Sequence, residues 1–177
     1  SPTVQVILAT GGGPMVRAAY SSGTPAIGVG PGNAPVYIDP DTDQNAAAKR
    51  LIDSKSFDNS VLCTNESVLI SQDRGRSQLE RALRANGAHI CNPDEVVKLR
   101  AWLFPEGHLN TGAVGKSAVW IAAQSGFRAA PSIRVLIAPV DTVGLDEPLT
   151  KEKLSPVLAW AMAGSFERAT GIAQMIL

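Results

Sequence analysis

The sequence predicts an α/β fold, and three observations lead to this prediction. Apolar, β-rich runs alternate with segments of helical periodicity along the chain, as in strands joined by helices. The 177 residues are 45% apolar, which suits one domain of ordinary size with a sizeable core. No internal repeat or low-complexity stretch interrupts the alternation.

The first part of the chain contains three expected strands and two expected helices. The strands are expected at residues 4–9, 26–29 and 35–38, and the helices at residues 15–21 and 41–55. Pro14 suits a first helical turn, where its missing N–H costs nothing. Asp41 or Thr42 is expected to cap the second helix.

After a loop at residues 57–63, the remaining elements follow in the same alternation. Strands are expected at residues 67–70, 88–90, 135–138 and 157–159. Helices are expected at residues 76–86, 94–103 and 112–124, and from residue 166 onward. Gly87 and Gly126 are expected to end helices in left-handed geometry, and Asn92 and Ser165 to begin them as caps.

Charge and cysteine content exclude several classes of protein. Lys+Arg and Asp+Glu balance at 16 each, which offers no argument for binding nucleic acid or an anionic membrane. No apolar run is long enough for a transmembrane helix, and no signal for export is apparent. Two cysteines and two histidines without ligand spacing argue against structural zinc, and no metal site is expected. We therefore expect a cytosolic protein with free thiols.

Cys63 is the candidate nucleophile. It lies at an expected loop-to-strand junction, where a side chain can point into a cleft, and thiolates form thioesters readily. By position alone, a lone cysteine is more often a small buried hydrophobic residue, and Cys91 is expected to be one. His89 and His108 have no acidic partner at a recognisable spacing and are expected to be surface or capping residues.

Three further segments contain candidate binding residues. Thr10, Gly11 and Gly12 form a Gly-rich turn from strand to helix, where backbone N–H groups can bind phosphate, although a tight turn explains the glycines equally well. The run 28–33, which includes Gly30, allows either a close ligand approach or a simple turn. Glu152 precedes an expected strand and could accept ribose hydroxyls, although a solvated charge is the commoner role.

Together these segments resemble the CoA-acylating branch of the aldehyde dehydrogenase superfamily. That branch includes the acetaldehyde and propionaldehyde dehydrogenases of bacterial microcompartments and the aldehyde half of bifunctional alcohol–aldehyde enzymes. The matching segments, which cover nearly the whole chain, are ATGG (9–12), VGPGN (29–33), SFDN…C (56–63), LFPEGHLN (103–110), VGKSA (114–118) and EKLSPVLA (152–159).

The resemblance implies a fold and a role for each candidate residue. It implies a three-layer αβα catalytic domain at residues 31–177, preceded at residues 1–30 by the last strand–helix–strand of a Rossmann nucleotide-binding domain, with truncation at both ends. It implies that Cys63 attacks an aldehyde, passes hydride to NAD or NADP, and holds an acyl thioester until coenzyme A removes it. The backbone N–H of Cys63 would stabilise the oxyanion.

The resemblance also assigns the remaining binding residues and partners. Thr10, Gly11, Gly12 and Gly30 would lie at the cofactor, and Glu152 would bind its ribose. Gly28 stands where hydrolytic members carry a water-activating glutamate, which favours a thiol acceptor over water. The implied partners are a small aldehyde, CoA and further copies of the chain as a homo-oligomer, in the cytoplasm or a bacterial microcompartment with its shell.

Two other interpretations remain open. A glutamyl-phosphate reductase of the same superfamily has a similar cysteine loop, but VGPGN and EKLSPV fit the acylating dehydrogenases better. Alternatively, the chain is an inactive fragment or an assembly module that only makes subunit contacts.

Overall fold

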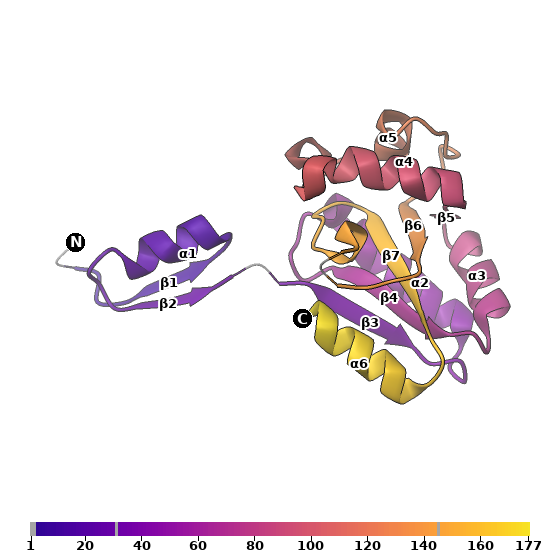
Figure 1. Ribbon diagram of the computed structural model, residues 1–177, viewed down its shortest axis with the longest axis horizontal. Coiled ribbons are helices and arrows are strands. Elements are labelled where there is room, and N and C mark those ends of the chain that lie inside the picture. Colours follow the sequence, from indigo (N-terminus) through magenta and orange to yellow (C-terminus); the bar gives the residue numbers. More distant parts are fainter. Residues whose placement is uncertain (1–2, 31, 145) are drawn as a thin grey trace. The chain divides into compact units, whose positions relative to one another are not determined.

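The computed structural model describes residues 3–30, 32–144 and 146–177 (Figure 1). The chain divides into two compact units, Ser1–Gly32 and Asn33–Leu177.

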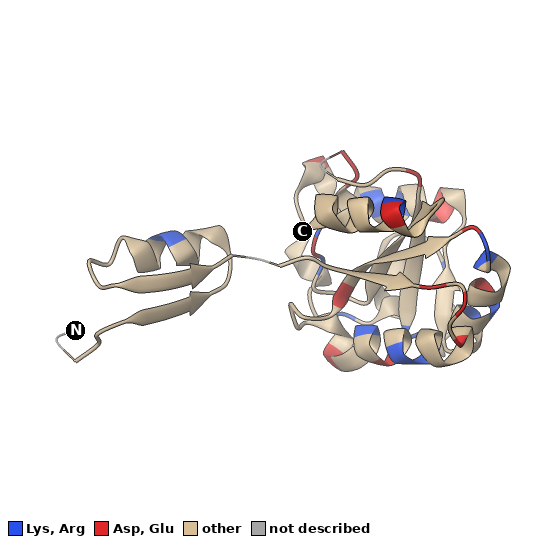
Figure 2. Ribbon diagram, turned by 90° about the horizontal axis from the view of Figure 1, so that it is seen from below, with Lys and Arg blue, Asp and Glu red and all other residues tan. Residues whose placement is uncertain are grey.

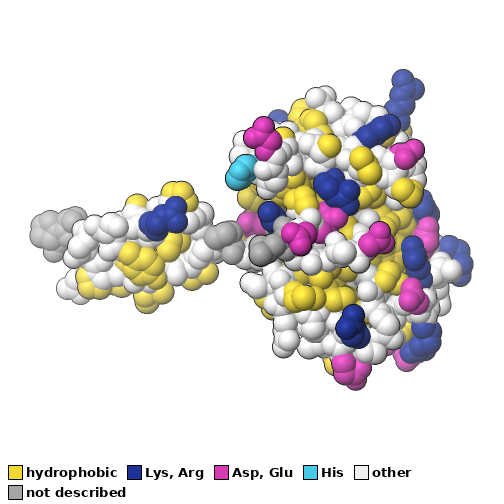
Figure 3. Space-filling view, viewed as in Figure 1, with side chains coloured by type: hydrophobic (Ala, Val, Ile, Leu, Met, Phe, Trp, Pro, Cys, Tyr) yellow, Lys and Arg dark blue, Asp and Glu magenta, His cyan; other side chains and the backbone are white. Residues whose placement is uncertain are grey.

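The first unit is a strand–helix–strand motif. It consists of β1 (Ile7–Thr10), α1 (Gly13–Tyr20) and β2 (Ala26–Val29). The two strands pair in parallel, with Ile7 opposite Ala26 and Thr10 opposite Val29. Residues alternate along both strands between more and less buried positions. The exposed positions include Leu8, Ile27 and Val29, and Figure 3 shows hydrophobic side chains on the visible surface of this unit.

The second unit is a three-layer αβα domain, which confirms the predicted fold. Its five strands are all parallel, in the order β3-β4-β7-β6-β5. They are β3 (Ala34–Ile38), β4 (Glu66–Gln72), β5 (Ala88–Ile90), β6 (Val135–Val140) and β7 (Val157–Ala163). The helices are α2 (Gln44–Ser56), α3 (Arg76–Ala85), α4 (Pro93–Leu103), α5 (Ala118–Gln124) and α6 (Phe166–Ile176).

Two hydrophobic clusters cover the two faces of this sheet. The side chains of α2 and α3 pack in one cluster, and those of α4, α5 and α6 pack in the other. A parallel sheet covered on both faces requires strands that are apolar at nearly every position, because neither face meets water. Strand β7, with the sequence VLAWAMA, has this composition and is buried along almost its whole length.

The start of helix α2 differs from the expected cap. Asp43, and not Asp41 or Thr42, is its N-cap, and the Asp43 carboxylate accepts hydrogen bonds from the backbone N–H groups of Asn45 and Ala46. Asp41 instead forms an ion pair with Arg74. Three capping residues stand in a row in this sequence, so only the path of the chain decides which one is used.

The single helix expected over residues 112–124 is wrong. A short 3-10 turn, η3 (Thr111–Ala113), is followed by Gly115 at φ +68°, and helix α5 begins only after its N-cap Ser117. The side chain of Ser117 accepts a hydrogen bond from the backbone N–H of Trp120. The expected caps Asn92 and Ser165 are correct.

Charged residues of both signs are distributed around the second unit, and Arg17 is the one charged residue between Thr3 and Gly30 (Figure 2). In the described part of the chain, no helix is both long and apolar enough to cross a membrane.

Candidate active site

Cys63 lies in an exposed turn between helix α2 and strand β4. After α2 the chain forms the 3-10 turn η1 (Phe57–Ser60), in which Asp58, Asn59 and Ser60 all have positive φ between 46° and 60°. Three consecutive non-glycine residues in this region carry backbone strain, which persists only where the surroundings hold it in place. Such strain is commonly found at functional sites.

Side chains at both ends of the turn hold the cysteine segment in place. The Asn65 amide donates a short hydrogen bond to the carbonyl of Ser54, and the Ser54 hydroxyl donates to Glu66 at 2.7 Å. The last turn of α2 is thereby tied to the first residue of β4. Within the described residues, the backbone N–H of Cys63 has no hydrogen-bond partner, so it is free to stabilise an oxyanion.

Gly115 connects the cysteine segment to the segment that carries Glu152. The Asn59 amide donates to the carbonyl of Gly115 at 3.0 Å, and the Gly115 N–H donates to the carbonyl of Leu154 at 3.1 Å. Strands β4 and β7 are neighbours and run parallel, so the segments that precede them meet at the same edge of the sheet. The motifs around residues 59, 115 and 152 are therefore brought together, although they lie far apart in the sequence.

Glu152 is half-buried, and its Oε1 atom is buried without a hydrogen-bond partner. Burial raises the pKa of this carboxyl group, against the opposing effect of Lys153 and Lys55. A buried carboxylate oxygen without a donor is costly, and a ligand that offers a hydroxyl group would remove that cost.

The buried side chain of Lys153 holds the Glu152 segment in place. Its side chain is fully buried, and its Nζ donates to the carbonyl and hydroxyl of Ser67 and to the carbonyls of Leu149 and Lys151, at 2.7 to 3.1 Å. Burial lowers the pKa of Lys153 well below its usual range. These contacts fix the backbone next to Glu152 against the start of strand β4.

Lys55 is a second buried lysine at this edge of the sheet. Burial lowers the pKa of its ammonium group to about 7, although Glu66 and Glu152 favour the charged form. Sequence reasoning did not single out Lys55. Its position in the last turn of α2, directly before the SFDN segment, was the available signal.

We expect Lys55 to make stability depend on pH. Its folded pKa of about 7 lies below the unfolded value of 10.5, so above pH 7 the unfolded chain binds more protons and the free energy of unfolding rises with pH. Between about pH 7 and 9 this rise should be roughly 1–3 kcal/mol, and Lys55→Met should remove it. Urea unfolding followed by tryptophan fluorescence measures the effect, because all three tryptophans lie in the second unit.

Lys49→Met is the matched control, because Lys49 lies on the same helix but is exposed. It should keep the pH dependence of the wild-type chain. Parallel pH profiles for Lys55→Met and the wild-type chain would contradict the expectation.

Cys91 is buried, as expected, and burial raises the pKa of its thiol to about 12. It therefore remains a neutral thiol at physiological pH and is a poor nucleophile. His89 was expected to be a surface or capping residue, but it is half-buried in strand β5, and its Nε2 lies 2.9 Å from a carboxylate oxygen of Glu95. Cys91 lies beside this pair, so His89, Cys91 and Glu95 form a cluster that sequence reasoning missed. The spacing His-x-Cys-x3-Glu was the only signal.

The predicted cofactor-binding residues Thr10, Gly11, Gly12 and Gly30 all lie in the first unit. The Gly11 N–H donates to the carbonyl of Val29 at 3.2 Å, so the turn after β1 lies beside the end of β2 that leads to Gly30. Gly12 is the N-cap of α1, and Pro14 lies in its first turn, as expected. These residues therefore form one group, while Cys63 and Glu152 belong to the second unit.

Side chains of helix α1 pack closely against Gly28. A Cβ atom at this position would lie 2.5 Å from Val16 Cγ1 and 3.1 Å from Tyr20 Cε2. The Tyr20 hydroxyl accepts from the Gly28 N–H at 3.0 Å and lies 3.4 Å from its carbonyl oxygen. Any larger residue here would require the side chains of Val16 and Tyr20 to shift.

The fold and the exposed cysteine define the class as an αβα domain with a thiol at the amino ends of its central strands. No family model matches the chain. Among curated proteins, the aldehyde-alcohol dehydrogenase of Clostridium acetobutylicum is 42% identical over 93% of this chain and 19% of its own length. The acetylating succinate-semialdehyde dehydrogenase of Clostridium kluyveri is 37% identical over 97% of this chain and 38% of its own length.

Solved structures agree with these relatives. An acetylating aldehyde dehydrogenase from Geobacillus thermoglucosidasius superimposes with a TM-score of 0.94 at 38% identity, over 98% of this chain and 38% of that one. A propionaldehyde dehydrogenase from Rhodopseudomonas palustris, with bound CoA and an acylated cysteine, gives 0.88 at 31% identity, over 99% and 40%. An engineered glycolyl-CoA reductase with bound NADP+ gives 0.88 at 32% identity, over 99% and 40%.

The chain belongs to the acylating aldehyde dehydrogenases and corresponds to one segment of them. It spans about a fifth to two fifths of the length of these relatives and structures.

Proposed function

We propose that this chain is the thiol-bearing part of an enzyme that interconverts a short-chain aldehyde and an acyl-CoA through a thioester on Cys63. The observation that carries the proposal is the exposed Cys63 turn, strained in its backbone and joined through Gly115 to the segment of Glu152. Relatives named as acetylating dehydrogenases, and a relative with an acylated cysteine, support the same reaction.

In the proposed reaction, the Cys63 thiolate attacks the aldehyde carbonyl and forms a thiohemiacetal. Negative charge develops on the former carbonyl oxygen, and the free N–H of Cys63 is placed to donate to it. Loss of hydride from the thiohemiacetal leaves an acyl thioester on Cys63. The thiolate of CoA then attacks the thioester carbonyl, the bond to Cys63 breaks, and the cysteine thiolate is released.

NAD or NADP accepts the hydride when it is bound. The unsatisfied Oε1 of Glu152 fits a ribose hydroxyl as its missing donor. In the first unit, the Thr10–Gly12 turn at the N-terminus of α1, with Gly30 beside it, fits the phosphates. We therefore assign residues 1–30 to the end of the nucleotide-binding domain and residues 31–177 to the catalytic domain.

The surroundings of Gly28 support CoA rather than water as the acyl acceptor. A glutamate at this position would have to place its Cβ within 2.5 Å of Val16 Cγ1. Without a general base, water is a poor acceptor for a thioester, whereas a thiol is already partly ionised near neutral pH.

For the whole protein, we propose a homo-oligomer located in the cytoplasm or within a bacterial microcompartment. These assignments rest on the family resemblance.

Acylation of Cys63 is the direct test. The chain is incubated with acetyl-CoA or propionyl-CoA, and its intact mass is followed beside those of Cys63→Ala and Cys91→Ala. We expect one acyl adduct on the wild-type chain and on Cys91→Ala, and none on Cys63→Ala, because only Cys63 is exposed. Cys91→Ala is the matched control, since it removes the other thiol.

An adduct that persists in Cys63→Ala, or that disappears in Cys91→Ala, would contradict the proposed role of Cys63. Transfer from an acyl phosphate but not from acyl-CoA would favour the glutamyl-phosphate reductase alternative. No adduct on any form would favour the inactive or assembly module.

A further inference from the structure

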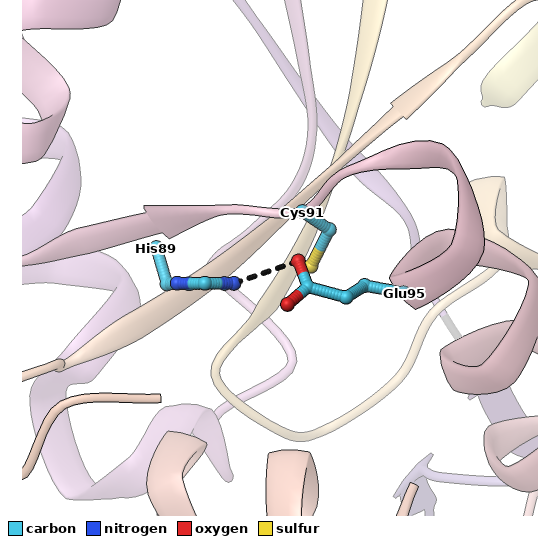
Figure 4. A group of neighbouring side chains, drawn as sticks. All are labelled: His89, Cys91 and Glu95. Carbon is cyan, nitrogen blue, oxygen red and sulfur yellow. Dashed lines mark hydrogen bonds and ion pairs between the residues drawn. The ribbon is translucent and has the colours of Figure 1, made fainter. Parts of the chain in front are cut away.

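His89, Cys91 and Glu95 bring three different donor atoms together at the end of strand β5. The ring nitrogen of His89, the sulfur of Cys91 and a carboxylate oxygen of Glu95 all lie within 4.8 Å of one another. Figure 4 shows the three side chains converging, with the His89 ring pointing toward the Glu95 carboxylate and the Cys91 sulfur next to it. The reaction proposed above uses none of these residues.

Rigid elements position all three side chains. His89 and Cys91 are two residues apart at the end of β5, so they project from the same face of the sheet. The Cys91 N–H donates to the carbonyl of Ile137 at 2.8 Å, and the His89 ring stacks on Phe127 with centroids 5.9 Å apart. Little ordering would be required of either side chain on binding a ligand.

Glu95 is held by the capping box of helix α4. Its carboxylate accepts a hydrogen bond from the Asn92 N–H at 2.9 Å, while the Asn92 side chain accepts one from the Glu95 N–H. The carboxylate therefore faces β5 in a fixed orientation. Among the described residues, the Cys91 sulfur has no hydrogen-bond partner, so one of the three donor atoms has a free lone pair.

We propose that His89, Cys91 and Glu95 bind one divalent transition-metal ion, and that zinc fits this donor set best. Zinc accepts imidazole nitrogen at about 2.0–2.1 Å, thiolate sulfur at about 2.3 Å and carboxylate oxygen at about 2.0–2.2 Å. Donor atoms in such a site lie roughly 3.3–3.6 Å apart. To reach these distances, the His89 and Glu95 donor atoms would move apart from 2.9 Å, and all three donor atoms, now within 4.8 Å of one another, would adjust around the ion.

The charges of the proposed site balance. A cysteine thiolate, a carboxylate and a neutral imidazole together cancel the charge of the ion, which lowers the cost of placing it in a largely buried position. On binding, the thiol proton of Cys91 passes to solvent, and the hydrogen bond between His89 and Glu95 is replaced by two bonds to the metal.

One of the three residues, Cys91, also faces a cavity, whereas His89 and Glu95 do not line it. Cys91 lines a cavity of about 690 Å³ at the carboxyl ends of β5 and β6, between helices α3 and α4. Asn92, Val96 and Arg100 also line it. A metal ion could enter from this cavity and keep a water molecule as its fourth ligand, as three-ligand zinc sites do.

Cys63 precedes β4 and Cys91 follows β5, so the site and the candidate nucleophile belong to opposite ends of the parallel sheet.

Cobalt titration of the 177-residue chain tests the proposal. The Cys63→Ala background removes the exposed thiol as a competing ligand. Co²⁺ is the probe, because a cobalt–thiolate bond produces an intense near-ultraviolet absorption that a nitrogen–oxygen site lacks. We expect one equivalent of Co²⁺ with this absorption, displaced by one equivalent of Zn²⁺. In this background Cys91→Ser should abolish the absorption, and His89→Ala should weaken binding by at least about 100-fold.

The Glu95→Gln variant distinguishes an effect on metal affinity from an effect on folding stability. Glutamine at this position keeps the capping box, so the variant should retain its thermal stability without metal but lose at least about 10-fold in metal affinity. Asp94→Asn is the matched control on the same helical turn and should bind like the parent. The proposal would be overturned by absence of the thiolate absorption, or by its persistence in Cys91→Ser. Unchanged cobalt affinity in Glu95→Gln would also overturn the proposal. His89 and Glu95 would then be only a hydrogen-bonded pair.

Discussion

Lys153→Ala should destabilise the second unit by about 3–5 kcal/mol. The lysine is fully buried and donates to four oxygen atoms on Ser67, Leu149 and Lys151, so its loss leaves buried acceptors unpaired and opens a cavity. Urea unfolding followed by tryptophan fluorescence measures the change as a lower midpoint at constant slope.

Two further variants separate packing from hydrogen bonding. Lys153→Met fills most of the space but donates no hydrogen bond, so it should still cost about 2–3 kcal/mol. Lys151→Ala removes an exposed lysine of the same loop and should stay within about 0.5 kcal/mol of the wild-type chain. If Lys153→Met were as stable as the wild-type chain, the hydrogen bonds of Lys153 would not be what holds the Glu152 segment in place.

Gly28→Glu should disrupt the first unit and should not produce a hydrolytic enzyme. Its Cβ would meet Val16 Cγ1 at 2.5 Å, and overpacking of this kind costs about 1–3 kcal/mol. The contact forces the Val16 and Tyr20 side chains to shift and so loosens the packing of helix α1 on strand β2. Amide hydrogen exchange should show the change as roughly tenfold or more faster exchange along β1 and β2, since 1.4 kcal/mol corresponds to a factor of ten.

Gly28→Ala and Gly30→Ala are the matched variants that test whether the close fit at Gly28 causes the faster exchange. Alanine at position 28 carries the same clash without the charge, so it should show most of the effect. Gly30 has no atom within 4 Å of an added Cβ and has no left-handed φ, so Gly30→Ala should exchange like the wild-type chain. Equal protection in Gly28→Ala and Gly30→Ala would mean that the close fit of helix α1 over Gly28 does not restrict this position.

Several features were determined by the sequence itself. Apolar runs of strand length, separated by capped helices, were sufficient to predict the α/β class. A strand of a parallel sheet is buried on both faces, so it is apolar at nearly every position. Asn92 and Ser165 were recognised as caps because each stands just before a helical run. The family motifs around Cys63 and Glu152 also predicted the chemistry that is proposed for these residues.

Other features were decided only by the tertiary structure. The choice of Asp43 as cap and the break at Gly115 depend on long-range contacts, since Gly115 bonds to Asn59 and Leu154 across the fold. The roles of Lys55 and Lys153 depend on burial, which one sequence does not reveal for a lysine. The cluster of His89, Cys91 and Glu95 exists because a strand end meets the first turn of the following helix. Local sequence patterns set which elements form, and only packing between distant elements decides which side chains meet.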